Sequence, residues 1–446
     1  MNTHYDLIII GAGAGGYTAA ERAGAAGKRV LLIEKAQLGG VCINVGCIPA
    51  KTLFQSAKIY RQLQDTERFG VHVDSVRFDM REVIARKRRI VAQLREGVRQ
   101  QIERRGGVIL QAEARLTGRK TVRADSVTYS AERILIASGA SPVIPELPGI
   151  DQPYVFTTTQ LFDLETLPSS LVILGGTPIA LNVASIYALA GSKVTLITDQ
   201  PALLPDVDEE IRALLLRDLS AIDFHLGSHV TQIVDKSVHI SSPSATHEVR
   251  ADAVLISGER APNLTGFGLE EVGIDADTRI HVDDYMRTNV PGVYAIGDVT
   301  GISMWAHSAA RMAQVAVNHM FGTVDRFRQD TVPFFLHTYP EIASVGLTEA
   351  AAKARGIPVQ IARLPLTANA SFLIENDAQR GLCKMVVDRR TNVVIGVHLY
   401  GGECSTLVLG AAAMLEDEFR VQDIQQMIFA HPTLSEVLRD TLDELR

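Results

Sequence analysis

Two cysteines near the start of the chain, Cys42 and Cys47, stand five positions apart in the run GGVCINVGCIPAK. A pair at this spacing can cycle between a dithiol and a disulfide, and the thiolate is the reactive form of either sulfur. The run is typical of the start of a helix, where backbone N–H groups and the cation of Lys51 lower a thiol pKa. We therefore interpret Cys42 and Cys47 as a redox-active pair.

A second reactive pattern, AHPTLSE, lies near the end of the chain and places Glu436 five positions after His431. A histidine that titrates near neutrality can accept a proton released by dithiol oxidation, and a carboxylate beside it fixes the tautomer and stabilises the imidazolium. Alone, such a pair is an ordinary surface feature, but together with the cysteines it indicates an acid/base dyad. Other histidines, including His4, His239 and His337, show no metal-ligand spacing, so no metal site is predicted.

The elements that must position these groups begin at the N-terminus. An apolar run over residues 6–10 leads into Gly11, Gly13 and Gly16, and after a helical stretch a second apolar run ends in Glu34. In such a βαβ unit the first glycine permits a tight turn, the second admits a pyrophosphate, and the third packs the helix on the strand. The helix N-terminus then faces the phosphates, and Glu34 accepts hydrogen bonds from ribose hydroxyls. A bound dinucleotide is predicted.

A second passage repeats this design. Residues 171–174 are apolar, Gly175 and Gly176 follow, and a helical stretch over residues 179–190 precedes an apolar run over residues 193–197. The chain therefore has two nucleotide-binding units. At 446 residues it is long enough for two to four domains.

The composition is that of a globular protein with few cysteines. Four cysteines favour a reducing compartment, and we predict a cytoplasmic protein with Cys383 and Cys404 in its core. Net charge is -7, and the main basic run, residues 86–105, has the apolar spacing of a solvated amphipathic helix, so nucleic-acid binding is not expected. The apolar stretch 5–20 contains Asp6 and lacks a basic start, so neither a signal peptide nor a membrane span is predicted.

The cysteine run, the sequence AIGD over residues 295–298 and the HPTLSE sequence together resemble the pyridine nucleotide-disulfide oxidoreductases, and among them the dihydrolipoamide dehydrogenases in motif order and approximate length. The resemblance implies an α/β fold with two Rossmann-like domains of the glutathione reductase type and an α+β dimerisation domain. The implied divisions are 1–145 (FAD-binding), 146–258 (NAD(P)-binding-like), 259–328 (return to the FAD-binding or central domain) and 329–446 (interface).

The resemblance also implies individual roles. Cys42 would exchange with the substrate, Cys47 would lie against the flavin, and Lys51 would sit beside the flavin ring. His431 and Glu436 would complete the cysteine site of the partner subunit in a homodimer. The implied FAD contacts, beyond the glycine loop and Glu34, are Ala114, Ser138, Gly139, Asp298, Ala306 and His307.

The second unit departs from the family form GGGYIGxE, because residues 175–182 read GGTPIALN. Thr177 replaces the second fingerprint glycine and is expected to crowd a phosphate, whereas Ala180 in the third place is a milder change. Pro178 replaces a residue that often gates the nicotinamide. Asn182 replaces a glutamate that pairs with the flavin-side lysine in the family, which leaves Lys51 without that carboxylate and predicts a higher flavin potential.

The strand after this loop ends in Thr198 with Asp199 beside it, where NAD enzymes of the family carry a glutamate, and no arginine cluster suggests a 2′-phosphate. NADP is disfavoured. Two interpretations of Gly175, Gly176 and Asp199 stay open: NAD binds weakly there, or the unit is a structural remnant.

We predict an FAD-dependent dithiol/disulfide oxidoreductase of the dihydrolipoamide dehydrogenase type, which passes electrons between a small-molecule or lipoyl dithiol, the Cys42–Cys47 disulfide, FAD and NAD. One alternative is a dithiol oxidase or disulfide reductase with a degraded nicotinamide site, which uses oxygen or a protein as its electron partner. Another is a redox-sensing flavoprotein with little turnover. The residues do not distinguish lipoamide from other disulfides.

Overall fold

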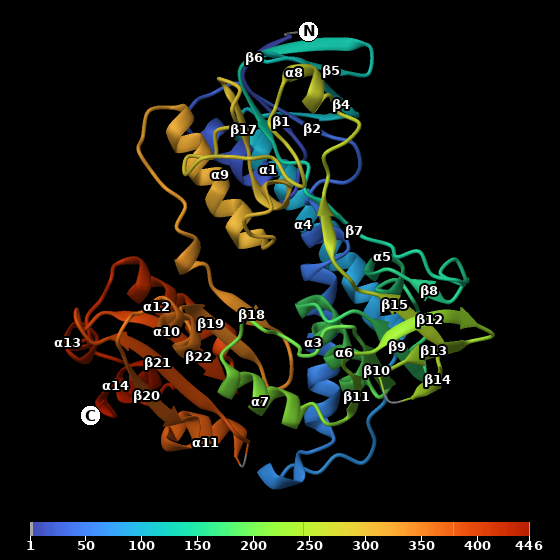
Figure 1. Cartoon of the computed structure of the whole chain (residues 1–446), viewed down its shortest axis with the longest axis vertical. Coiled ribbons are helices and arrows are strands. Elements are labelled where there is room, and N and C mark those ends of the chain that lie inside the picture. The colour runs from blue at the N-terminus through green and yellow to red at the C-terminus, as the bar shows by residue number, and fades with distance from the viewer. Residues whose placement is uncertain (1–2, 244, 378, 446) are drawn as a thin grey trace.

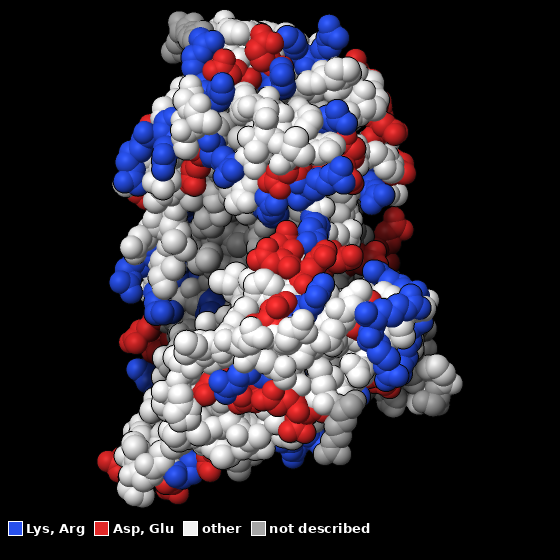
Figure 2. Space-filling view, turned by 90° about the vertical axis from the view of Figure 1, so that its left-hand side faces the viewer, with Lys and Arg blue, Asp and Glu red and all other residues white. Residues whose placement is uncertain are grey.

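The computed structural model describes residues 3–243, 245–377 and 379–445. Its elements gather around three large sheets, one at the top of Figure 1 and two below it. None of the described helices is both long and apolar enough to cross a membrane. Figure 2 shows acidic and basic side chains intermixed over one face, which is hollowed midway along its length. That face has no continuous basic surface of the kind that follows a phosphate backbone.

The first sheet has the strand order β3-β2-β1-β6-β5-β4, and β17 pairs with β6. β1 is parallel to β2 and β6, and β17 is parallel to β6, so these strands end at one edge of the sheet. Their nearly continuous apolar runs are typical of parallel strands buried on both faces. The strands are β1 (His4–Ile10), β2 (Val30–Glu34), β3 (Val108–Gln111), β4 (Ala114–Gly118), β5 (Thr121–Ala124), β6 (Val127–Ile136) and β17 (Val293–Ala295).

Helices α1 and α9 pack against each other beside this sheet, while α3 and α4 run together toward the second sheet (Figure 1). The amphipathic helix predicted over residues 86–105 is part of α4, which begins earlier and ends at Arg104, although Lys87 is buried and contacts Asp163 at 2.6 Å. The helical elements of this part are α1 (Ala14–Ala25), α2 (Gly40–Asn44), α3 (Cys47–Leu63), η1 (Glu67–Phe69), α4 (Met80–Arg104), α8 (Leu269–Val272), η2 (Gly297–Thr300) and α9 (Ala306–Met320).

The second sheet is wholly parallel, in the order β11-β10-β9-β15-β8. The short pair β7 and β16 forms the neck where the chain passes into this part and out again (Figure 1). The division of the chain at residues 145, 258 and 328 stays a prediction. The elements are β7 (Ala140–Pro142), β8 (Val155–Phe156), α5 (Thr158–Leu161), β9 (Ser170–Leu174), α6 (Pro178–Ala190), β10 (Lys193–Ile197), α7 (Glu209–Asp218), β11 (Ile222–His225), β12 (His229–Val234), β13 (Ser237–Ser241), β14 (Thr246–Arg250), β15 (Ala253–Ile256) and β16 (Arg260–Pro262).

The third sheet is antiparallel, in the order β18-β19-β22-β21-β20. Cys383 and Cys404 are fully buried in the core between this sheet and its helices, which confirms their predicted place. The elements are η3 (Gln329–Thr331), β18 (Phe334–Leu336), β19 (Ile342–Gly346), α10 (Glu349–Ala354), β20 (Val359–Pro365), η4 (Leu366–Ala368), α11 (Ala370–Asn376), β21 (Leu382–Asp388), β22 (Val394–Tyr400), α12 (Cys404–Glu416), α13 (Val421–Gln425), η5 (Leu434–Glu436) and α14 (Val437–Asp443).

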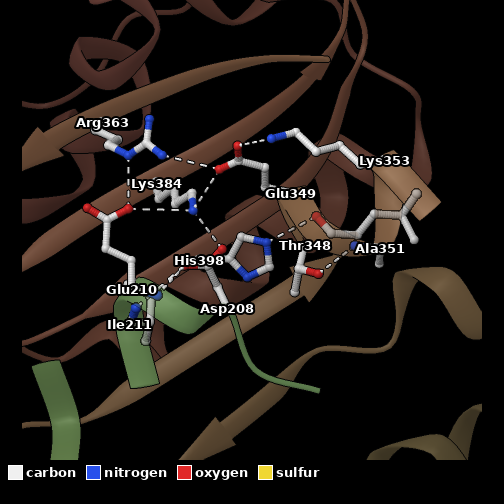
Figure 3. A network of polar contacts seen from close by, with 11 residues as sticks. Asp208, Glu210, Ile211, Thr348, Glu349, Ala351, Lys353, Arg363, Lys384 and His398 are labelled. Atoms are coloured by element: carbon white, nitrogen blue, oxygen red, sulfur yellow. Dashed lines mark hydrogen bonds and ion pairs between the residues drawn. The ribbon is translucent and has the colours of Figure 1, made fainter. Parts of the chain in front are cut away.

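A buried ionic cluster joins the second part of the chain to the third sheet (Figure 3). The Lys384 side chain on β21 is only 5% exposed, and its Nζ lies 2.8 Å from Asp208 Oδ2 and 3.1 Å from Glu349 Oε2. Asp208 also accepts backbone hydrogen bonds at the start of α7, and Arg363 of β20 contacts Glu210 at 2.9 Å. Because a buried ammonium needs its carboxylate partners, this cluster fixes α7 against the sheet.

Candidate active site

The glycine loop after β1 leaves the N-terminus of α1 open to a ligand. A side chain added at Gly16 would lie 1.9 Å from the Gly11 carbonyl oxygen, so helix and loop are in backbone contact. At Gly13 the nearest atom to an added side chain is Gly40 Cα, 4.0 Å away. Gly13 is the N-cap and offers no side chain to the first turn, so the N–H groups there can receive an anion.

The acidic residue predicted to hold a ribose lies beside this loop. Glu34 ends β2, and its two carboxylate oxygens accept hydrogen bonds from Ala12 N (2.7 Å) and Ala36 N (2.8 Å). Next to the same strand end, Ala112 N donates to Glu34 O at 3.1 Å, and Ala114 begins β4. An open helix N-terminus with a carboxylate and an apolar strand start beside it fits the adenosine and pyrophosphate part of FAD.

The remaining predicted FAD residues follow strands that end at the same edge. Ser138 and Gly139 come after β6, where Ser138 Oγ donates to Asn263 O at 3.0 Å. Asp298 lies in η2 directly after β17, and burial raises the pKa of its carboxyl, opposed by the nearby cation of Arg260.

Ala306 and His307 begin α9, which packs on α1. His307 Nε2 lies 2.8 Å from Pro333 O and therefore donates to it, while burial lowers the pKa of the ring. The first sheet thus brings the ends of β1, β2, β6 and β17 and the starts of α1 and α9 into one region. Their proposed contacts with FAD follow from this placement.

The two cysteines lie directly against the glycine loop. Cys42 is in α2 and Cys47 is the first residue of α3. A side chain added at Gly40 would lie 2.6 Å from Gly13 Cα, so the backbone of α2 touches the loop. Both cysteines are free thiols, and Cys42 donates a hydrogen bond that lowers the pKa of Cys47, helped by a backbone N–H at the helix start, although burial opposes the shift. The same hydrogen bond raises the pKa of Cys42, so the structure favours a Cys47 thiolate beside a Cys42 thiol.

Sequence analysis missed the residues that hold this pair. Asn44 Nδ2 donates to Leu38 O (2.9 Å) and Gly40 O (2.8 Å), and Arg95 Nη2 donates to Asn44 Oδ1 at 2.7 Å, which ties α2 to α4. Arg260 at the neck is close enough to lower the pKa of Cys47. A lone arginine after a strand carries no sequence signal, because only the fold brings it to the thiols.

Lys51 lies one turn into α3. The substitution at position 182 was expected to leave Lys51 without the glutamate of the family pattern, and among the described residues Asn182 Oδ1 is buried without a hydrogen-bond partner. Lys51 Nζ, however, lies 3.1 Å from His337 Nδ1 and 4.0 Å from Glu341 Oε1. A carboxylate therefore does lie near Lys51, but it belongs to Glu341 beside the third sheet and not to residue 182.

The predicted acid/base pair forms, but away from the cysteines of its own chain. His431 Nδ1 lies 3.1 Å from Glu436 Oε2, and the pKa of Glu436 is lowered by the Thr433 N–H and then by His431. The His431 side chain is 74% exposed. In Figure 1, α14, which directly follows Glu436, lies on the far side of the third sheet from α3, which begins at Cys47.

The second glycine loop is closed by its own side chain. Thr177 is the N-cap of α6, and its Oγ1 accepts from Ala180 N (3.2 Å) and donates to Ser257 O (3.0 Å). Pro178 in the first turn has no N–H to offer. A side chain at Gly176 would lie 2.8 Å from Thr198 Oγ1, so the loop is also walled by the end of β10. This arrangement fits a dinucleotide pyrophosphate poorly.

The other predicted residues of this unit flank the closed loop. Gly175 makes the turn after β9, and Asp199 is exposed after Thr198. Asp199 is therefore free to approach a ligand that the loop itself does not favour.

Comparison with known proteins agrees with this architecture. Residues 5–316 match the model of the pyridine nucleotide-disulphide oxidoreductases, and residues 332–442 match their dimerisation domain. The dihydrolipoyl dehydrogenase of Thermus scotoductus is 34% identical over 99% of this chain and 97% of its own length. That of Bacillus subtilis is 32% identical over 98% of this chain and 97% of its own length.

Two solved structures also match over nearly their whole length. The HOCl-induced flavoprotein disulfide reductase RclA from Escherichia coli, as a Cu(II) complex, is 30% identical with a TM-score of 0.87 and 99% of both chains covered. LpdA from Mycobacterium tuberculosis is 26% identical with a TM-score of 0.92, again with 99% of both chains covered. Proteins of this kind use FAD, with NAD(P) as a second cofactor. The chain therefore belongs to the pyridine nucleotide-disulphide oxidoreductase family and is a flavoprotein disulfide oxidoreductase with a dimerisation domain.

Proposed function

We propose that the protein oxidises a small dithiol of the lipoyl type, with the Cys42–Cys47 disulfide as the first electron acceptor. The observation that carries the proposal is the placement of the free Cys42 in α2 and Cys47 at the start of α3, where the backbone of α2 touches the glycine loop. The lowered pKa of Cys47 beside the Cys42 thiol agrees with this placement. Bound FAD would accept the electron pair from the reduced cysteines. The name that the curated relatives share, dihydrolipoyl dehydrogenase, supports this substrate class.

The exchange balances in two steps. A substrate thiolate attacks the Cys42 sulfur and breaks its bond to Cys47, which leaves as a thiolate. The second substrate sulfur then attacks the first, closes the substrate disulfide and frees Cys42. Two electrons have moved to the cysteines, and the two protons of the dithiol have gone to Cys42 and to a base.

We assign that base to His431 of a second copy of the chain. Its ring is exposed, and the Glu436 carboxylate on Nδ1 leaves Nε2 as the proton acceptor. His431 and Glu436 both fall within the matched dimerisation domain. Large apolar side chains on the same domain, Ile428 and Leu409, are 100% and 76% exposed in the single chain, as expected of a surface that another subunit covers.

The second candidate is a dithiol oxidase or disulfide reductase whose electron partner is oxygen or a protein. The Thr177 cap favours it, because the pyrophosphate place at α6 is already filled by a side chain.

An anaerobic titration of the flavin absorbance with dihydrolipoamide, NADH and NADPH in separate runs tests both candidates. Bleaching or a thiolate-to-flavin charge-transfer band with dihydrolipoamide supports the dithiol reaction, and the absence of both contradicts it. A response to NADH at low stoichiometry removes the second candidate. Cys42→Ser is the control, since it should abolish dithiol turnover while FAD stays bound. Little steady-state turnover with any dithiol would instead indicate the redox-sensing alternative.

A further inference from the structure

The Lys51 side chain is 46% exposed, and its ammonium contacts groups that lie beside strands of the third sheet. Its Nζ lies 3.1 Å from His337 Nδ1 and 5.7 Å from the centre of the Phe54 ring. Asn182, at the place where the family pattern has a glutamate, leaves its Oδ1 buried and without a partner among the described residues. Burial lowers the pKa of Lys51 and Glu341 raises it.

Glu341 is a buried carboxylate held in a fixed position. Its side chain is 5% exposed and lies just before β19, and its Oε2 accepts the Ser405 N–H at 3.2 Å. Its Oε1 lies 4.0 Å from Lys51 Nζ and 3.5 Å from His337 Nδ1. Burial raises the pKa of Glu341, but the Ser405 N–H and the Lys51 ammonium oppose this effect and hold the pKa low. A buried, ionised carboxylate must be paired, and Lys51 is the lysine within reach.

His337 holds the Lys51 ammonium in place. A lysine ammonium only donates, so the short contact makes His337 Nδ1 an acceptor and places the ring proton on Nε2. The ring is held between Phe54 and Phe335, with centroids 5.5 Å and 5.1 Å away. This packing fixes the direction in which Nδ1 points and therefore the position of Lys51 Nζ.

Lys58 and Glu403 form a second lysine–carboxylate ion pair near Lys51, at 3.4 Å. The Glu403 side chain is 71% exposed, so solvent screens it far more than Glu341. Of the two carboxylates that face these lysines, Glu341 therefore has the stronger effect on Lys51.

We propose that Glu341 is the positioning counterion of Lys51, with His337 holding the ammonium in place, and that it takes the part that the family pattern gives to a glutamate at position 182. It acts on the flavin through the charge and place of Lys51. The inference rests on the proposed function only in requiring FAD beside Lys51.

The two-electron midpoint potential of the bound flavin tests the proposal, measured anaerobically with mediator dyes and with neither dithiol nor nicotinamide present. Glu341→Gln keeps the shape and the acceptor for Ser405 but removes the negative charge, so the reduced flavin is favoured. We expect the redox equilibrium to move toward reduction by about tenfold, which is about 30 mV for a two-electron couple. Glu403→Gln is the matched control and should move it less than about twofold.

Two further variants sharpen the test. Asn182→Glu in the Glu341→Gln background returns a carboxylate to Lys51 and should restore most of the wild-type potential. Glu341→Asp keeps the negative charge but moves it farther from Lys51 Nζ, which is already 4.0 Å from Glu341 Oε1. We expect a shift of the flavin potential in the same direction as in Glu341→Gln, but a smaller one. If Glu341→Gln does not retain FAD, the potential of Glu341→Asp tests the proposal instead.

Potentials for both Glu341 variants within about twofold of wild type in equilibrium constant would overturn the proposal. Failure to oxidise dihydrolipoamide would contradict the proposed function alone, because the potential is measured without any substrate.

Discussion

In the first nucleotide-binding unit, Gly13 caps α1 without a side chain, and the space beyond it is open as far as Gly40. In the second, Thr177 occupies the equivalent place and turns its hydroxyl onto the Ala180 N–H. Both loops join a parallel strand to a helix in the same way. The N–H groups of a helix N-terminus can bind a side chain or a phosphate. In the first unit they are left open to a phosphate, and in the second they bind the Thr177 side chain.

The difference teaches that the fold of this loop does not depend on the glycine that ligand binding needs. Threonine is among the preferred N-cap residues, and proline suits the following position, so the Thr-Pro sequence stabilises α6. The residue at the N-cap therefore affects two separate properties, the stability of the helix and the affinity for a dinucleotide. A substitution there is expected to raise one and lower the other.

The largest effect is expected from moving the cap into the first loop. Gly13→Thr should leave the fold intact, because the nearest atom is 4.0 Å away, but should place a side chain where the pyrophosphate binds. Loss of two hydrogen bonds to a charged group, at about 1.5–3 kcal/mol each, weakens FAD binding by at least about 100-fold. Flavin content of the purified protein measures this, with circular dichroism as the check on folding. If the purified Gly13→Thr protein still contains FAD, a threonine at this position does not block the pyrophosphate, and the contrast between the two loops fails.

The second unit is also held from outside, by the cluster in Figure 3. Lys384→Met leaves the buried Asp208 carboxylate without its ammonium, which should destabilise the protein by about 3–5 kcal/mol. The control is Lys353→Met, because Lys353 contacts the same Glu349 at 2.7 Å from a side chain that is 65% exposed; its cost should stay below about 1 kcal/mol. Urea denaturation measures both variants. Equal losses would show that burial of Lys384 is not what holds α7.

Removing the cap tests the second loop directly. Thr177→Gly combined with Ala180→Gly restores the fingerprint and frees the Ala180 N–H, so NADH should bind at least about tenfold more tightly, about 1.4 kcal/mol. Thr177→Ser keeps the hydroxyl and should leave the affinity within about twofold. Isothermal calorimetry measures each affinity. Micromolar NADH binding by the wild type would instead show that the cap opens for the ligand.

The smallest effect concerns the thiolate beside the first loop. The Cys42 hydrogen bond is the largest cause of the lowered Cys47 pKa, and Arg260 contributes with the opposite charge. Because the pKa is below its ordinary value, the thiolate and its charge-transfer absorbance persist to lower pH than for an ordinary thiol and disappear as the pH falls through the lowered pKa. Arg260→Met should move this midpoint upward by up to about one pH unit.

Absorbance followed during an anaerobic pH titration of the reduced protein measures the shift. Arg115→Met, which removes an exposed arginine paired with Glu271, should leave the midpoint unchanged. A downward shift in Arg260→Met would contradict the assigned role of the cation.

The parts of the site that could be predicted from the sequence are those formed by residues close together in the chain. The glycine loop, Glu34 and the cysteine run each lie within one short segment, so their spacing already carries their local geometry. The Thr177 cap was only partly predicted. Crowding of the phosphate was expected, and the Thr-Pro sequence is itself a signal for a capped helix start. The family, the α/β fold and the dimerisation domain are confirmed by the matches over residues 5–316 and 332–442.

The residues that could not be predicted come from distant segments. Glu341, His337 and Arg260 reach the cysteine region only because the third sheet and the neck fold back onto α3. No local spacing connects them with Lys51 or Cys47. The substitution at residue 182 was visible, but its consequence for Lys51 depended on a contact of tertiary structure.

The backbone contact between Gly40 and Gly13 joins the cysteine helix to the loop that would cradle FAD. Two equilibria that share such a contact are thermodynamically reciprocal. If disulfide formation displaces α2 and changes the affinity for FAD by some factor, FAD must change the stability of the disulfide by the same factor. The chain would then sense its own oxidation state as cofactor occupancy, and the ratio of apoprotein to holoprotein would report the redox poise of its surroundings.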